Sequence, residues 1–141
     1  MSSGPAISLT NVDIAYDGTR VVQGVSFDVA RGESFALVGE SGSGKSTVLK
    51  ALCGLAPEWT GKMEILGQPG PRRPGRTLAK QCQMVFQDPY GSLHPRKTVD
   101  AVLSEPLAIH GIGDQDARVK QALVDVGLDA RFRFRYPHQM S

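Results

Sequence analysis

The sequence predicts an α/β protein with a small antiparallel β unit at its beginning, and three patterns indicate this fold. Apolar and polar residues alternate over Ala6–Tyr16 and again over Val25–Val29, which is typical of half-buried strands. Phe35–Val38 is a short continuous apolar run, as expected of a strand buried on both faces, and it leads into a glycine-rich stretch. Apolar residues then recur at helical spacing over Val48–Cys53. A strand, a loop and a helix in this order are the building unit of α/β folds.

The boundaries of these first elements are marked by local signals. The alternation slips by one residue between Leu9 and Val12, which indicates a β-bulge in the first strand. Asp17-Gly18 is a turn signal, so we expect the first strands to run antiparallel. Gly54 or Pro57 is expected to end the helix that follows the glycine-rich stretch.

The next part of the chain predicts short strands and a helix. Lys62–Leu66 and Gln83–Gln87 are short apolar runs that we expect to form strands. Between them, Gln68–Arg76 is rich in Pro, Gly and Arg and is expected to be a loop. Thr98–His110 is expected to be helical, with an interruption near Pro106.

A last helix is expected after Asp114, whose side chain can cap its amino end. Val119, Leu123 and Val126 lie on one face at helical spacing, which predicts an apolar stripe. Gly127 suits the carboxyl end of this helix, because glycine tolerates the left-handed conformation found there.

The composition is that of an ordinary globular chain, and it excludes some classes of protein. The chain has 141 residues, of which 40% are hydrophobic and 21% charged, which fits a single domain. No apolar stretch approaches the roughly 18–20 residues that span a bilayer, and no secretory signal is recognisable, so we expect a cytoplasmic location. Cys53 and Cys82 each lie in an apolar stretch, which predicts buried free thiols rather than a disulfide or a metal site.

The charge pattern does not predict a nucleic-acid partner. The net charge of +2 is too small to attract nucleic acid or membrane by itself. Basic residues cluster in the Pro/Gly-rich loop, but no aromatic residues are interleaved with them, so a solvated surface is the better interpretation. These residues are Arg72, Arg73, Arg76 and Lys80.

The stretch Gly39–Thr47 fits the pattern G-x-x-x-x-G-K-[ST] at every fixed position. Its glycines let the backbone curl, so that successive N–H groups point at phosphate oxygens. The helix that begins near Gly44 presents its free N–H groups and the positive end of its dipole to the same phosphates. Lys45 can bridge the β- and γ-phosphates, and the Ser46 hydroxyl can ligate Mg²⁺. The predicted nucleotide-phosphate site comprises Gly39, Glu40, Ser41, Gly42, Ser43, Gly44, Lys45, Ser46 and Thr47.

Around this loop the sequence resembles the ATPase subunits of ABC (ATP-binding cassette) transporters. Tyr16 precedes the loop by about the interval of the family's A-loop aromatic, which stacks on adenine. Val85–Pro89 is similar to the family's Q-loop, which implies that Gln87 reaches Mg²⁺ and the attacking water.

Three further stretches make the resemblance more specific. Ser92–Arg96 and Ser104–Leu107 resemble the dipeptide and oligopeptide importer branch of the family. Tyr136–Ser141 resembles the run into the ABC signature, which the family continues with two glycines and a glutamine. Non-transport ABC ATPases of DNA repair and translation lack the importer-like stretch Ser92–Leu107, so we rank them low.

The resemblance implies a partial ABC ATP-binding domain over residues 1–141. An antiparallel β subdomain would extend to about residue 33, a P-loop core would follow over 34–87, and a Q-loop region with part of a helical subdomain over 88–141. The implied cofactors are ATP and Mg²⁺, the latter held by Ser46 and Gln87. The implied partners are a second ABC nucleotide-binding domain, identical or paralogous, and transmembrane permease subunits that dock around Gln87–His110. The subunit would then lie in the cytoplasm, on the inner face of the cell membrane.

The resemblance also implies that part of the machinery is not in these residues. The Walker B strand with its Mg²⁺-binding Asp and catalytic Glu, and the switch histidine, have no counterpart, so no catalytic residue is assigned. Ala122–Asp125 ends in an acid, but its apolar residues continue a helical stripe. We expect this chain alone to bind nucleotide without hydrolysing it, and the missing strands to leave apolar surface exposed.

Two alternatives remain beside an ATPase that powers peptide import. One is a catalytically inactive nucleotide-binding fragment. The other is a different P-loop class such as a GTPase, because Asp88–Gly91 matches the short D-x-x-G pattern. That match follows Gln87 and precedes Ser92, as in the ABC pattern, and the guanine-specifying N-K-x-D does not occur in these residues, since Asn11 is the only asparagine.

Overall fold

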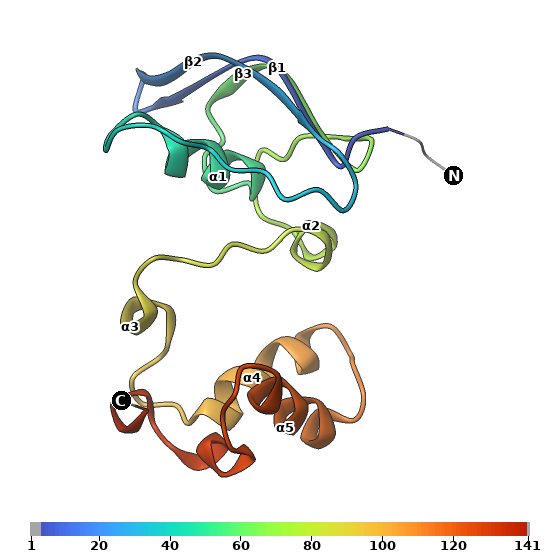
Figure 1. Cartoon of the computed structure of the whole chain (residues 1–141), viewed down its shortest axis with the longest axis vertical. Helices are drawn as coiled ribbons and strands as arrows, with labels where there is room; N and C mark the ends of the chain where they lie inside the picture. Colours follow the sequence, from blue (N-terminus) through green and yellow to red (C-terminus); the bar gives the residue numbers. More distant parts are fainter. Residues whose placement is uncertain (1–3, 141) are drawn as a thin grey trace. The chain divides into compact units, whose positions relative to one another are not determined.

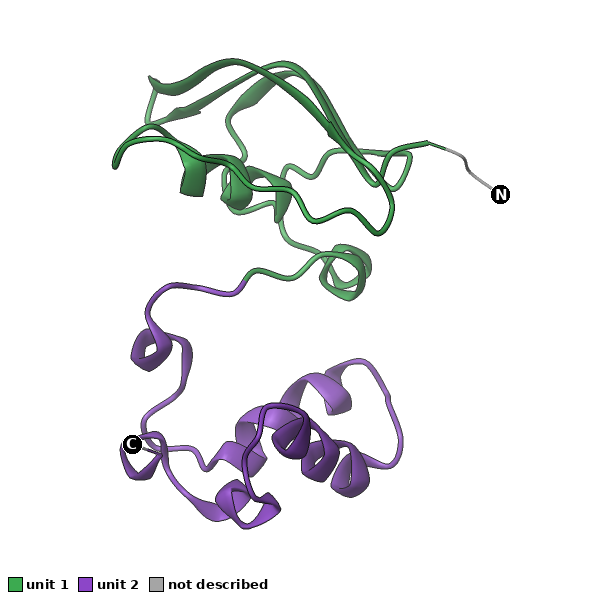
Figure 2. Ribbon diagram, viewed as in Figure 1, with its two compact units in different colours: residues 1–84 green, residues 85–141 purple. Residues whose placement is uncertain are grey.

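The computed structural model describes residues 4–140, and the chain divides into two compact units. Unit 1 comprises residues 1–84 and unit 2 residues 85–141 (Figure 2). Unit 1 is a sheet with a helix packed on it, and unit 2 is made of helices (Figure 1). None of the described helices is long and apolar enough to cross a membrane.

Unit 1 is built on an antiparallel sheet with the strand order β2-β1-β3-β4. Its strands are β1 (Ile7–Tyr16), β2 (Thr19–Val29), β3 (Trp59–Ile65) and the short β4 (Gln68–Pro69). β1 is an inner strand of the sheet and pairs with both β2 and β3. The predicted antiparallel opening and the predicted strand at Lys62–Leu66 are therefore confirmed.

The turn and the bulge predicted in the first hairpin are both present. Asp17 and Gly18 have φ angles of 48° and 73°, which is the left-handed pair that a two-residue hairpin turn needs. The register of β1 shifts between Leu9 and Val12, and Asn11 has a φ of 48° at this point. An extra residue in β1 thus keeps its apolar side chains on the core face on both sides of the bulge.

The core of unit 1 forms between the sheet and α1 (Lys45–Leu52). Val48, Ala51 and Leu52 of the helix are buried. They meet buried side chains of the strands, namely Leu9, Val12, Ile14, Val22, Trp59, Met63 and Ile65. Val48 and Leu52 of the predicted apolar spacing thus fill this core, whereas Leu49 is 45% exposed.

Gly54, rather than Pro57, ends α1. Gly54 has a φ of 73°, and the Leu55 N–H donates to the Lys50 carbonyl at 2.8 Å while the Gly54 N–H donates to Ala51 at 3.0 Å. This pair of bonds is the usual glycine-terminated helix end.

Two predicted strands are wrong. Phe35–Val38 and Gln83–Gln87 have no regular secondary structure, and Val38 and Val85 are 93% and 96% exposed. A strand is stable only when its N–H and C=O groups bond to a neighbour, and no strand in residues 4–140 pairs with either segment. The expected exposed apolar surface is confirmed at these segments. A short helix, α2 (Arg76–Gln81), precedes the second segment and was not predicted.

Unit 2 contains α3 (Pro89–Ser92), α4 (Val99–Ile109), α5 (Gln115–Asp125) and two 3₁₀ turns, η1 (Ala130–Phe134) and η2 (Pro137–Gln139). Its core is small and lies between α4 and α5. Val99 of α4 and Val119 and Leu123 of α5 are its buried members. The helices predicted at Thr98–His110 and after Asp114 are confirmed to within a residue or two.

Three details of these helices differ from the prediction. Val126, expected on the apolar stripe of α5, is the C-cap residue of this helix and is 70% exposed. α4 continues through Pro106. The proline has no N–H and so cannot donate a helical hydrogen bond, but its carbonyl still accepts the His110 N–H at 3.1 Å. Asp114 precedes α5 but does not cap it through its side chain. Its φ of 55° is left-handed, whereas a capping side chain is aimed at the first turn from an extended backbone.

The carboxyl end of α5 is formed as predicted. Gly127 has a φ of 78°, and the N–H groups of Gly127 and Leu128 donate to Val124 and Leu123 at 2.9 Å each. The chain can therefore reverse there and lead into η1.

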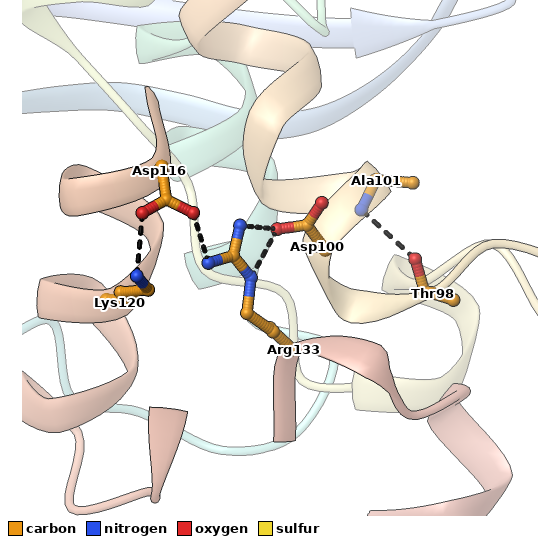
Figure 3. Close-up of polar contacts among 6 residues, drawn as sticks. All are labelled: Thr98, Asp100, Ala101, Asp116, Lys120 and Arg133. Carbon is orange, nitrogen blue, oxygen red and sulfur yellow. Dashed lines mark hydrogen bonds and ion pairs between the residues drawn. The ribbon is translucent and has the colours of Figure 1, made fainter. Parts of the chain in front are cut away.

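An arginine joins the elements of unit 2. The Arg133 guanidinium of η1 donates to Asp100 of α4 at 2.8 Å and to Asp116 of α5 at 2.5 Å, and Asp116 also pairs with Lys120 (Figure 3). Arg133 is only 8% exposed, the one buried charged residue in the described part of the chain. The guanidinium fork matches two carboxylates at once, so this residue connects three separate elements.

Candidate nucleotide-binding site

The glycine-rich loop is held in its curled form by backbone conformations that only glycine adopts easily. Gly42 and Gly44 have φ angles of 80° and 93°. A Cβ atom on Gly44 would lie 2.6 Å from a methyl carbon of Val22 in β2, which is far inside van der Waals contact. Gly44 is therefore required both for its backbone angle and for the close approach of the loop to the sheet.

The ammonium group of Lys45 lies inside the curl of the loop. It donates to the Gly39 carbonyl at 2.7 Å, the Glu40 carbonyl at 2.5 Å and the Ser43 hydroxyl at 3.0 Å. All three acceptors are uncharged, so the positive charge of Lys45 is not neutralised by them. Phosphate oxygens are stronger acceptors for an ammonium than neutral oxygens, and so can compete for it.

The amino end of α1 offers further donors to an anion. Gly44 is the N-cap residue and has no side chain, so the N–H groups of the first turn receive no side-chain cap. The first turn also contains no acidic residue that would offset the positive end of the helix dipole. The exposed Ser46 lies in this turn, and its hydroxyl is a hard oxygen ligand of the kind that Mg²⁺ prefers.

Tyr16 lies at the end of the first hairpin. It is the last residue of β1, pairs with Thr19 across the turn, and is partly buried against the core of unit 1. Because Gly44 abuts Val22 of β2, the hairpin and the loop approach each other at one end of unit 1 (Figure 1). Tyr16 is thus in the same compact unit as the loop.

Gln87 belongs to unit 2, where it is exposed. Asp88, the next residue, caps α3 by accepting the Tyr90 N–H at 3.0 Å. A Cβ atom on Gly91 would lie 2.6 Å from the Asp88 carboxylate, so the capping position of Asp88 depends on a glycine at residue 91. Asp88 thus shapes the turn that follows Gln87, and the joint role of Gln87 and Ser46 stays a prediction.

A cavity of about 430 Å³ lies in unit 1, and Lys45 and Ser46 form part of its lining. Its walls are mostly apolar and include Phe27, Phe35 and Leu49. The rings of Phe27 and Phe35 stack there with centroids 4.9 Å apart. An apolar lining does not recognise phosphates, so the phosphate site is the polar surface of the loop rather than this cavity.

The sequence pattern predicts the residues of the loop but not the residue of the sheet against which the loop packs. Val22 forms the surface against which Gly44 packs, and it lies 22 positions earlier in the chain. Only the glycine at position 44 indicates a close contact in the sequence, and a glycine does not identify the residue that it contacts.

A family model described as ABC transporter matches residues 22–141, which include the loop, Gln87 and all the helices of unit 2. The chain belongs to the ABC transporter family. This match covers most of the chain, and it confirms the family that the loop and its surroundings predicted.

Relatives among curated proteins carry names of import systems. The glutathione import ATP-binding protein GsiA of Salmonella typhi is 44% identical over 129 residues, which cover 85% of this chain and 20% of that protein. A putative peptide import ATP-binding protein of Brucella abortus (strain 2308) is 42% identical, over 86% of this chain and 39% of that protein. The chain thus spans well under half the length of these relatives.

Solved structures confirm the fold class. The ATP-binding cassette MJ0796, described as a dimer in a post-hydrolysis state bound to ADP and Pi, matches with a TM-score of 0.78 and 26% identity. A structure described as the ATP binding subunit of an ABC transporter matches with a TM-score of 0.77 and 26% identity. Each match covers 96% of this chain, but only 63% and 56% of the other chains, so the chain is part of an ABC nucleotide-binding domain.

Proposed function

We propose that this chain is the ATP-binding part of a subunit that powers the import of peptides or related solutes by ATP hydrolysis. The observation that carries the proposal is the position of Lys45, whose ammonium is held inside the curled loop by neutral oxygens alone. The import names of the relatives support the solute class. The import-like stretches Ser92–Arg96 and Ser104–Leu107 support the same branch.

In this proposal each residue of the site has one task. The amides of Gly39–Thr47 bind the phosphates, and Lys45 bridges the β- and γ-phosphates once its loop acceptors are exchanged for them. Tyr16 stacks on the adenine. Ser46 and Gln87 are the residues that would hold Mg²⁺, which when bound neutralises charge on the transferred phosphoryl group.

The same proposal includes the partners and the location. A second ABC nucleotide-binding domain, identical or paralogous, would cover the loop, and permease subunits would contact the region Gln87–His110. The subunit would then lie on the inner face of the cell membrane without crossing it. The division into a β subdomain to about residue 33, a P-loop core over 34–87 and a helical part over 88–141 belongs to this proposal too.

We predict that the 141-residue chain alone binds MgATP but does not hydrolyse it. The groups that would bind and position the phosphates are present. No Walker B aspartate or glutamate, which would bind Mg²⁺ and activate the attacking water, is recognisable in the sequence. Phosphate release that is abolished by Lys45→Ala would contradict this prediction.

The test of nucleotide binding is a calorimetric titration of the chain with MgATP. The Lys45→Ala variant should bind MgATP roughly 10- to 100-fold more weakly than the wild type, because it loses a charge-assisted contact to phosphate. Lys50→Ala is the matched control, since Lys50 lies in the last turn of the same helix and should leave affinity unchanged. Equal affinities of Lys45→Ala and the wild type would refute the site, and a preference for GTP over ATP in competition would favour the GTPase alternative.

A further inference from the structure

The two cysteines of the chain lie side by side in unit 1, although 29 positions separate them. Their sulfur atoms are 3.6 Å apart and share a hydrogen bond. Cys53 directly follows α1, and Cys82 directly follows α2. Both are partly exposed and both are free thiols. The prediction of free thiols is confirmed, but the predicted burial is wrong, and the sequence did not predict their contact.

We propose that Cys53 and Cys82 form a redox-active dithiol, which a low-molecular-weight disulfide oxidises to an intramolecular disulfide. The proposal stands on the contact between the two sulfur atoms, on the access that their partial exposure gives to a small oxidant, and on the place of both residues just beyond a helix end.

The geometry favours a disulfide over a metal site. A disulfide bond is about 2.0 Å long, so the two sulfur atoms must approach by roughly 1.6 Å. Each cysteine is the C-cap residue of its helix, and its backbone N–H still donates to the helix, Cys53 to Leu49 at 3.2 Å and Cys82 to Leu78 at 2.8 Å. The approach therefore has to come mainly from rotation of the two cysteine side chains. Thiolate metal sites need more ligands than two, and residues 4–140 contain no group of three or more His, Cys, Asp or Glu residues that could hold a metal ion.

The oxidation is a pair of thiol–disulfide exchanges. Burial, with the hydrogen bond to Cys82 adding to it, raises the pKa of the Cys53 thiol to about 11, so Cys53 keeps its proton at neutral pH and the first attack falls to Cys82. The Cys82 thiolate attacks one sulfur of the small disulfide, forms a mixed disulfide and expels one small thiolate. Cys53 then loses its proton and attacks the Cys82 sulfur, which expels the second small thiolate. The two protein thiol protons end on the two released thiols, so the small disulfide is reduced as the protein pair is oxidised.

The bond would change how the nucleotide loop is connected to the rest of the chain. α1 carries Lys45 at its amino end and Cys53 just after its carboxyl end. Cys82 lies in the segment that leads to Gln87. The disulfide would therefore tie the helix that carries Lys45 to the start of that segment and close the intervening chain into a covalent loop.

The basic residues inside this covalent loop provide a direct assay. Arg72, Arg76 and Lys80 lie between the two cysteines and are exposed, so trypsin can cut there. After oxidation with hydroxyethyl disulfide, the folded chain should lose both maleimide-reactive thiols and the mass of two hydrogen atoms. Trypsin-nicked fragments should then stay together on a gel without reductant and separate when reductant is added.

Single variants and an unfolded control keep the result specific. Cys53→Ser should take up one small-thiol adduct at Cys82, and the nicked fragments of Cys53→Ser and of Cys82→Ser should separate without reductant. Two separate small-thiol adducts on the folded wild-type chain would overturn the proposal. So would two thiols that stay open to maleimide under conditions in which the same oxidant forms the disulfide in a urea-unfolded chain.

Discussion

Gly44 supports the phosphate loop in two ways, and replacing it with alanine tests both. Its φ of 93° is left-handed, and a Cβ there would lie 2.6 Å from a methyl carbon of the buried Val22. Gly42 is the matched control, because it also has a left-handed φ, of 80°, but nothing lies within 4 Å of the place where its Cβ would be. The two glycines therefore separate backbone strain from steric conflict.

The expected loss of stability follows from these two contributions. A left-handed backbone costs a residue with a Cβ about 1–2 kcal/mol. An added carbon that must displace a packed side chain costs a further ~1–3 kcal/mol. Gly44→Ala should therefore lower the free energy of unfolding by roughly 2–5 kcal/mol, and Gly42→Ala by only about 1–2 kcal/mol.

The assay is urea unfolding followed by tryptophan fluorescence. Trp59 is the only tryptophan and is 7% exposed in the core of unit 1, so its emission reports the unit that contains the loop. Val22→Ala removes the methyl groups that an alanine at position 44 would meet. The double variant should therefore be more stable than the sum of the single effects by about 1–3 kcal/mol.

Additive effects of Val22→Ala and Gly44→Ala would refute the steric part of this reasoning. Equal destabilisation by Gly44→Ala and Gly42→Ala would refute it as well, because it would leave backbone strain as the only cost at either position.

Two predictions concern unit 2. The hydrogen bonds from Lys120 and Arg133 hold the pKa of the Asp116 carboxyl below its ordinary value. Its stabilising effect is therefore present above the unfolded pKa of about 4 and is lost as the pH falls through the folded pKa. The melting temperature of the wild type should thus fall more steeply below that pH than that of Asp116→Asn; parallel curves would contradict this. Leu123→Ala, at a position 3% exposed, should cost about 2–4 kcal/mol in unfolding followed by helical circular dichroism. Val124→Ala, at a neighbouring position 56% exposed, should change stability by no more than about 0.5 kcal/mol, and similar losses in both variants would disprove the assignment of the core.

Features that depend on neighbouring residues were predictable from the sequence. The phosphate loop needs only a fixed order of Gly, Lys and Ser, and the hairpin turn needs only Asp17-Gly18. The helix ends at Gly54 and Gly127 likewise depend on one residue's freedom to adopt a left-handed conformation. The conformation of these elements is determined by residues close to each other in the sequence, so the sequence pattern predicts them correctly.

Features that depend on distant partners were not predictable. Phe35–Val38 has the composition of a buried strand, but a strand also needs a neighbour, which composition does not reveal. The contact of Cys53 with Cys82 and the bridge of Arg133 to Asp100 join positions 29 and 33 apart. No local pattern marks such pairs, because the fold of the intervening chain decides whether they meet.

The most direct test of the phosphate site is to follow the backbone amide signals of the chain by NMR while MgATP is added. The amides of the loop and of the first turn of α1 should move most, with Gly42, Gly44, Lys45 and Ser46 among them, because their N–H groups would bind the phosphates. Lys45→Ala should reduce these shifts at the same nucleotide concentration. Shifts that centre elsewhere in the chain, or no shifts at saturating MgATP, would contradict the assignment of Gly39–Thr47 as the nucleotide site.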